Sequence, residues 1–242
     1  MLTDRERKHL IDFRKKIIET CNNCLGNGWV AGRECLCFHL YTLEAKKAYA
    51  EIPMEYRGFT IDMIDQPESF GSKTLVETYI KNLRERHENG DGLLLWSENT
   101  GSAKTTLACI VLMNALEQGF SAHYTTLAKC LDMIYAGWYD EMIKVQFQKQ
   151  ILDTDFLLID DLGGMEIATN SSDAKVSALT TLFKERSQAM LPTIITTNLS
   201  PDQLQKDFKA RTFSTILQRL EIIHCPGPDF RREVIAKTKE NK

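Results

Sequence analysis

The pattern of hydrophobic and polar positions divides the chain near Pro53. Before this proline, apolar residues recur at helical spacing from about residue 4 to 20, behind a capping box formed by Thr3 and Glu6. A second, more polar helix is expected at about residues 41–50, because proline disfavours helix in the residue before it. The pattern therefore predicts two short helices ahead of a separate domain.

Beyond the proline, helical and strand patterns alternate, which is typical of an α/β domain with a mainly parallel sheet. We predict a small domain at residues 1–52 and a larger one at residues 53–242. Short apolar runs predict strands at residues 93–96, 121–125, 156–159, 193–196 and 221–224. Helical periodicity predicts helices near residues 72–88, 104–118, 126–136, 138–151, 174–189 and 209–220.

Composition and charge are those of a globular protein and exclude a fibrous or disordered chain. Hydrophobic residues make up 43% and charged residues 26% of the chain. The net charge of −3 means that any DNA-binding surface must be local. The longest apolar run, Leu107 to Met113, is far short of the roughly 20 residues of a membrane helix. Since the N-terminus has no secretory signal, we expect a cytoplasmic protein with no membrane partner.

Disulfides are not expected in the cytoplasm, so the seven cysteines need another explanation. Cys21, Cys24, Cys35 and Cys37 form a C-x2-C-x10-C-x-C pattern, with glycines between the pairs that permit reversing turns. Four thiolates would fill the tetrahedral shell of Zn²⁺, so we predict a structural zinc site. His39 is an alternative to Cys37, and reduced thiols or a redox pair are the alternatives without zinc. The other three cysteines are expected to be buried thiols.

The loop after the first predicted strand, SENTGSAKTT, partly matches the phosphate-binding pattern G-x-x-x-x-G-K-[ST]. Lys104 would contact the β- and γ-phosphates of ATP, and Thr105 would bind Mg²⁺. Glu98 and Ala103 stand where the two motif glycines belong, and a loop that merely caps a core helix is the alternative interpretation. The candidate nucleotide-binding residues are Asn99, Thr100, Gly101, Ser102, Ala103, Lys104, Thr105 and Thr106.

Polar residues near the ends of later strands support a phosphate site. Asp160 would hold Mg²⁺, and Asp161 would orient the attacking water. Asn198 follows the next strand and would hydrogen-bond the γ-phosphate or the water. Arg219 and Arg231 are candidate cations for transition-state charge. Taken singly, each of these residues is also compatible with a solvated strand end, a turn or a structural arginine.

The order of these features resembles the DnaC, DnaI and IstB group of AAA+ ATPases over about residues 53–242. The phrases that carry the likeness are LLLWSENTGSAKTTLA, LLIDDLGG, PTIITTN, TILQRL and GPDFRR. The resemblance implies an AAA+ P-loop NTPase domain, preceded here by a small zinc-binding domain. The roles that it implies are Walker A for Lys104 and Thr105, Walker B for Asp160 and Asp161, sensor 1 for Asn198, the arginine finger for Arg219 and sensor 2 for Arg231.

The cysteine module is also similar to that of Firmicutes-type and phage helicase loaders. The resemblance therefore implies an ATPase that binds a replicative hexameric DNA helicase through residues 1–52 and delivers it to single-stranded DNA. An arginine finger acts from a neighbouring subunit, so Arg219 implies self-association in a ring or spiral. Glu98 and Ala103 depart from Walker A and predict weak activity. Two alternatives stay open: an IstB-like transposition helper ATPase, and an adaptor that binds nucleotide without hydrolysis.

Overall fold

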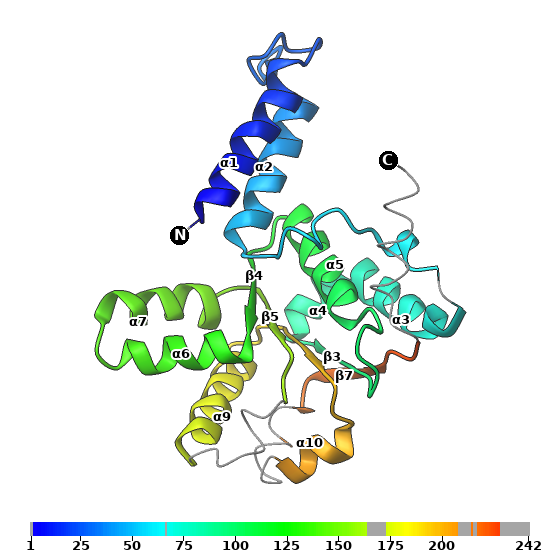
Figure 1. The fold of residues 1–242 in the computed structure, drawn as a ribbon, viewed down its shortest axis with the longest axis vertical. Helices are drawn as coiled ribbons and strands as arrows, with labels where there is room; N and C mark the ends of the chain where they lie inside the picture. Colours follow the sequence, from blue (N-terminus) through cyan, green and yellow to red (C-terminus); the bar gives the residue numbers. More distant parts are fainter. Residues whose placement is uncertain (1, 66, 164–172, 208–213, 215–216, 228–242) are drawn as a thin grey trace.

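The structure is a computed structural model of the 242-residue chain (Figure 1). It describes residues 2–65, 67–163, 173–207, 214 and 217–227. A long helical hairpin at the N-terminus projects from an α/β body built on a central sheet (Figure 1). Among these residues, no helix combines the length and the apolar character that crossing a membrane requires.

The helical hairpin consists of α1 (Asp4–Arg14) and α2 (Leu36–Tyr49), which lie side by side (Figure 1). The predicted capping box of α1 is confirmed, because the hydroxyl of Thr3 accepts from the Glu6 N–H at 3.2 Å and the Glu6 carboxylate accepts in return. A turn of π-helix, η1 (Lys15–Glu19), extends α1. At the tip, β1 (Trp29–Val30) pairs with β2 (Arg33–Glu34) in an antiparallel hairpin, and α2 follows earlier than predicted.

The body contains a five-stranded sheet in the order β4-β5-β6-β3-β7, and every pair of neighbours is parallel. The predicted α/β class with a parallel sheet is therefore confirmed. Side chains on β3 and β5 alternate between two buried apolar clusters, one on each face of the sheet. The strands are β3 (Gly92–Trp96), β4 (Ala122–Thr126), β5 (Phe156–Asp160), β6 (Thr193–Thr197) and β7 (Leu220–His224).

Helices cover both faces of the sheet, which gives the body three layers (Figure 1). The first face packs against η2 (Ile61–Met63), α3 (Phe70–Lys81), α4 (Leu83–Asn89) and α5 (Lys104–Glu117), and η3 (Pro67–Ser69) leads into α3. The second packs against α6 (Leu127–Gly137), α7 (Glu141–Phe147), η4 (Gln148–Leu152), α9 (Asp173–Gln188) and α10 (Pro201–Asp207).

Two helices differ from the sequence-based prediction. The single helix expected at residues 72–88 is broken at Asn82, whose φ of −108° leaves the helical range, so α3 and α4 are separate. The short helix α10 was not predicted, because Leu204 is its only large apolar residue and one such position sets no helical periodicity. Most of the helix predicted at residues 209–220 lies outside the described residues.

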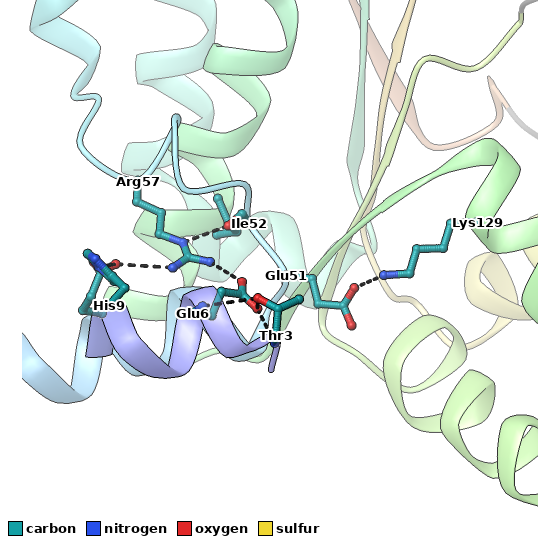
Figure 2. Close-up of polar contacts among 8 residues, drawn as sticks. Thr3, Glu6, His9, Glu51, Ile52, Arg57 and Lys129 are labelled. Atoms are coloured by element: carbon teal, nitrogen blue, oxygen red, sulfur yellow. Dashed lines mark hydrogen bonds and ion pairs between the residues drawn. The ribbon is translucent and has the colours of Figure 1, made fainter. Parts of the chain in front are cut away.

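A buried arginine joins the helical hairpin to the body (Figure 2). The guanidinium of Arg57 donates to the Glu6 carboxylate of α1 at 2.9 Å and to the carbonyl of Ile52 at 2.8 Å. It also lies 3.5 Å from the carboxylate of Glu44 on α2, which contacts His9 at 3.1 Å. This ion-pair network spans both helices of the hairpin.

The end of α2 also leads directly into the body. Ala50 and Ile52 belong to the apolar cluster on the first face of the sheet, and the Ala50 carbonyl accepts from the Tyr124 N–H at 2.8 Å. Between them, Glu51 forms an ion pair with Lys129 on α6 (Figure 2). The base of the hairpin is therefore packed as part of the body.

Candidate functional site

Strands β3, β5 and β6 end at one edge of the sheet, and a cavity of about 290 Å³ opens there. The carboxyl ends of parallel strands are where α/β proteins place their ligand sites. The cavity contains most of the residues predicted to bind nucleotide. Its lining residues are Tyr56, Thr100, Gly101, Ser102, Ala103, Lys104, Thr105, Thr106, Asp160, Asp161, Thr196 and Asn198.

The loop from β3 to α5 adopts the backbone conformation that the motif glycines would allow. Gly101 has a φ of +81°, and Ala103, directly before α5, has a φ of +60° and a ψ of +8°. The left-handed region costs a residue with a side chain about 1 kcal/mol. Ala103 therefore reproduces the loop at some cost in stability, and its N–H stays available at the helix N-terminus.

Lys104 is the first residue of α5, directly after this loop, and its side chain is buried. Its ammonium group donates to the carbonyl of Asn99 at 2.9 Å, to the hydroxyl of Ser102 at 3.2 Å and to the carbonyl of Ser97 at 3.4 Å. A positive charge and the amino end of α5 converge on the cavity, and both favour an anion. The arrangement suits the phosphates of a nucleotide.

Asp160 is held by three hydroxyl groups from three other elements. One carboxylate oxygen accepts from Thr105 at 2.9 Å and from Thr196 at 2.5 Å, and the other accepts from the phenol of Tyr124 at 2.9 Å. Burial, together with the Asp160 charge, raises the pKa of Tyr124 well above its usual range. The Thr105 hydroxyl and the Asp160 carboxylate are hard oxygen ligands, so this donor pair fits Mg²⁺.

Asp161 and Asn198 form a second polar pair at the same edge. The Asn198 amide donates to the Asp161 carboxylate at 3.3 Å, and the Asp161 N–H donates to the Thr196 hydroxyl at 2.9 Å. The φ of Asp161 is +58°, so the chain turns sharply directly after β5. An amide and a carboxylate in contact can together orient a water molecule.

Among the described residues, three that were singled out in the sequence are not in the cavity wall. The amide of Asn99 donates to the Gly227 carbonyl at 3.2 Å, and Glu98 points toward His224. Arg219 lies at the opposite edge of the sheet, where its guanidinium donates to the Asn89 carbonyl at 2.5 Å. Arg231 lies outside the described residues.

The sequence reasoning missed three residues of the site: Tyr56, Tyr124 and Thr196. Thr196 is in the wall because β6 lies beside β5, with Ile159 opposite Ile195. Tyr124 reaches Asp160 because β4 is the other neighbour of β5. A prediction of the strand order could have found these two residues, whereas no sequence signal marks Tyr56.

The four N-terminal cysteines lie together at the tip of the helical hairpin. Their sulfur atoms are all within 4.8 Å of one another, and three of the four side chains are buried. This donor set fits a tetrahedral Zn²⁺ ion. His39 is exposed and lies outside the cluster, so the structure brings Cys37, and not His39, to the other three.

Local hydrogen bonds prepare one thiol of the cluster for deprotonation. The backbone N–H of Cys37 and the amide of Asn23 lower the pKa of Cys35 to about 6. Burial and the neighbouring thiols raise the pKa of Cys37 to about 12. A metal ion that binds all four as thiolates must therefore displace at least one proton.

Comparison with known proteins places this geometry in context. A family model for IstB-like ATP binding proteins matches residues 80–232. The DnaC helicase loader has a similar structure, with a TM-score of 0.62 and 20% identity over 72% of this chain and 100% of that one. DnaI is similar with a TM-score of 0.61 and 19% identity, over 72% and 95% of the two chains.

AMPPCP-bound DnaA from Aquifex aeolicus has a TM-score of 0.59 and 15% identity, over 76% of this chain and 56% of that one. No curated protein matches the chain in sequence. At these identities, the solved structures establish an AAA+ P-loop fold and nothing finer. The family match extends over more than half of the chain and includes every residue that lines the cavity except Tyr56, but not the helical hairpin.

Proposed function

Because the chain belongs to the IstB-like ATP binding protein family, within the DnaC/DnaI/IstB-like AAA+ ATPases, we propose that it is an ATP-dependent helicase loader. In this proposal it binds a hexameric replicative helicase and delivers it to single-stranded DNA. The observation that carries the proposal is the cysteine cluster at the far end of a hairpin that projects from the ATPase body (Figure 1).

The tip of the hairpin has the character of a binding surface. It exposes a set of large apolar side chains, although the four thiols beside them are mostly buried. Apolar groups exposed close together favour a protein partner. We propose that residues 1–52 form the helicase-binding domain and that these side chains contact the helicase: Leu25, Trp29, Val30, Leu36 and Leu40.

In the cavity, Lys104 would bind the β- and γ-phosphates of ATP. Thr105 and Asp160 would hold Mg²⁺, which supplies positive charge beside the phosphates when it is bound. Asp161 and Asn198 would orient the attacking water, since their side chains already contact each other at 3.3 Å. These roles follow the residues that line the cavity.

Arg219 would complete the site of a neighbouring subunit. It lies at the edge of the sheet opposite its own cavity, so it cannot reach its own nucleotide, and this position supports assembly in a ring or spiral. The role of Arg231 remains the one that the resemblance implies. Contact with single-stranded DNA would be electrostatic, and its affinity should fall steeply with salt.

Co-purification of the full-length chain with a hexameric replicative helicase tests the proposal. We expect the double variant Leu25→Ser with Trp29→Ala to lose the complex while it keeps ATP binding. Point variants are preferable to deletion of residues 1–52, because Ala50 and Ile52 belong to the core of the body. A helicase complex that survives the double variant would contradict the assignment of the tip as the binding surface.

ATPase measurements separate the loader from a non-hydrolysing adaptor. We expect DNA-stimulated hydrolysis that disappears in Lys104→Ala and in Arg219→Ala. Loss in Arg219→Ala should be rescued when this variant is mixed with Lys104→Ala, because each would supply the group that the other lacks. Absence of hydrolysis in the wild type would favour the adaptor.

The family match itself favours a second candidate, a transposition helper ATPase. This function would use the same cavity residues but a transposase and duplex DNA as partners. Parallel co-purification with a transposase and with a helicase discriminates the two. Stable binding of the transposase alone would replace the loader proposal.

A further inference from the structure

Glu98 stands at the position of the first motif glycine, yet its carboxylate turns away from the cavity. The carboxylate lies 3.6 Å from Nε2 of His224, and Glu98 is not among the residues that line the cavity. Two like unit charges 4 Å apart repel by about 1 kcal/mol even in water, and a triphosphate carries several charges. The outward orientation of Glu98 therefore removes an obstacle to ATP.

The sheet itself fixes the position of His224. Strand β7 runs parallel to β3, with His224 in register beside Trp96. The two rings stack with centroids 4.3 Å apart and planes inclined by 27°. The N–H of the next residue, Cys225, donates to the Trp96 carbonyl at 2.8 Å. One face of the imidazole is therefore held against Trp96, the last residue of β3, and Glu98 follows two residues later.

The loop between β3 and α5 has a second contact with the segment that follows β7, in addition to the contact between Glu98 and His224. The side-chain amide of Asn99 donates to the Gly227 carbonyl at 3.2 Å. The backbone carbonyl of the same residue accepts from the ammonium group of Lys104 at 2.9 Å. The segment from His224 to Gly227 thus contacts two consecutive loop residues, Glu98 and Asn99.

We propose that His224 is a positioning residue for the nucleotide site. It pairs with Glu98 and keeps the carboxylate away from the phosphates, which lets a loop that lacks the first motif glycine bind ATP. This inference rests on the proposed ATP site. His224 would act through Glu98 alone and would contact neither the nucleotide nor the metal.

A double-mutant cycle on the full-length protein tests the inference. The affinity for ATP in the presence of Mg²⁺ is measured by calorimetry for the wild type, His224→Ala, Glu98→Gln and the double variant. We expect His224→Ala to weaken ATP binding about threefold to fivefold, the range that a largely exposed ion pair can supply. Glu98→Gln should bind at least as tightly as the wild type, and the double variant should equal Glu98→Gln.

The same strand offers a matched control. Glu221 is the second residue of β7, at the end of the strand far from the cavity, and pairs with Arg86 at 3.0 Å. Glu221→Ala removes a comparable ion pair and should leave ATP affinity unchanged. Thermal unfolding of each variant shows whether the fold is retained.

The outcomes separate the inference from the proposed function. Failure of the wild type to bind ATP overturns both. Wild-type binding with an unchanged affinity in His224→Ala overturns the inference alone. The inference is also overturned if His224→Ala lowers ATP affinity by the same factor in the wild type and in Glu98→Gln. His224 would then act without the Glu98 carboxylate.

Discussion

The cysteine cluster and the nucleotide cavity are both candidate ligand sites, but the packed structure that holds each of them differs greatly in size. The cluster packs against a few apolar residues such as Ile18 and Phe38, at the tip of the helical hairpin and beside the short β1–β2 pair. The cavity lies on a five-stranded sheet with an apolar cluster on each face. The metal would therefore be part of the fold at the tip, whereas the nucleotide would bind to a fold that exists without it.

The polar groups of the two sites reflect the same difference. In the cavity, Asp160 accepts three hydroxyl hydrogen bonds from residues on three elements of the body. At the tip, the thiols contact one another and a few local N–H groups: the Cys24 and Cys37 sulfurs are 3.4 Å apart, and Cys24 also accepts from the Gly28 N–H at 3.3 Å. A metal ion bound by the four thiols would therefore add cross-links that the tip lacks, whereas the cavity is already held by the body.

Removal of one zinc ligand should have the largest effect. In Cys24→Ser, we expect bound zinc to fall from one ion per chain to a small fraction, because apparent binding free energies of structural zinc reach roughly 10 kcal/mol or more. The tip should lose its ordered structure, visible as faster amide hydrogen exchange at residues 21–37. ATP affinity should stay within about twofold of the wild type.

His39→Ala is the matched control, since this histidine is exposed and outside the cluster. Its zinc content should remain one per chain by elemental analysis. Loss of zinc in His39→Ala, or one zinc per chain in Cys24→Ser, would contradict the four-cysteine assignment.

The second largest effect should come from Arg186, which is buried in the body and forms no ion pair with a carboxylate of the described residues. Its guanidinium donates to five backbone carbonyls and to the Thr193 hydroxyl. Burial lowers the pKa of Arg186 to about 9. Arg186→Met should cost about 3 kcal/mol, because several buried carbonyls lose their donors. The melting temperature should fall by roughly 10 °C.

Zinc content provides the comparison for this variant. Arg186→Met should retain one zinc per chain, since the tip does not depend on the body for its metal ligands. Lys184→Met removes an exposed charge from the same helix and should leave the melting temperature within about 2 °C. A melting temperature of Arg186→Met within that range would show that the arginine network contributes little.

Lys104 offers the opposite test, a large loss of binding without a loss of stability. Lys104→Ala should weaken ATP binding about 10-fold to 100-fold, as expected for hydrogen bonds to a charged group. The melting temperature without nucleotide should change little, because the loop stands on a complete sheet. Lys144→Ala, in which an exposed lysine of α7 is removed, is the control for both measurements.

Unchanged ATP affinity in Lys104→Ala would place the nucleotide elsewhere. A large fall in melting temperature without nucleotide would instead show that the lysine is structural. Either result would contradict the view that the nucleotide binds to a fold that is stable without it, whereas the metal is part of the fold at the tip.

The sequence predicted those features that depend on neighbours along the chain. The buried strands read as short apolar runs, and the four-cysteine spacing and the Thr3–Glu6 capping box are local signals. Contacts made by tertiary pairing could not be predicted in this way. Thr196 reaches Asp160 because β6 pairs with β5, and Glu98 meets His224 because β7 lies beside β3.

The junction between the two regions depends on tertiary pairing in the same way. Arg57 joins Glu6 and Glu44, which belong to separate helices, and no periodicity in the sequence links these three residues. Burial alone would raise the pKa of Glu6. The bonds from Thr3 and Arg57 outweigh this effect, so the pKa of Glu6 lies below its usual range.

The smallest predicted effect follows from this lowered pKa. A carboxylate whose pKa is lower in the folded state contributes stability above its unfolded pKa, and it loses that contribution as the pH falls through the folded value. Glu6→Gln should therefore cost about 1 kcal/mol at pH 7, and its difference in melting temperature from the wild type should shrink below about pH 4. Asp4→Asn removes an exposed carboxylate from the same helix turn and should cost little stability at pH 7. A constant difference at all pH values would mean that Glu6 joins the hairpin to the body by its shape rather than by its charge.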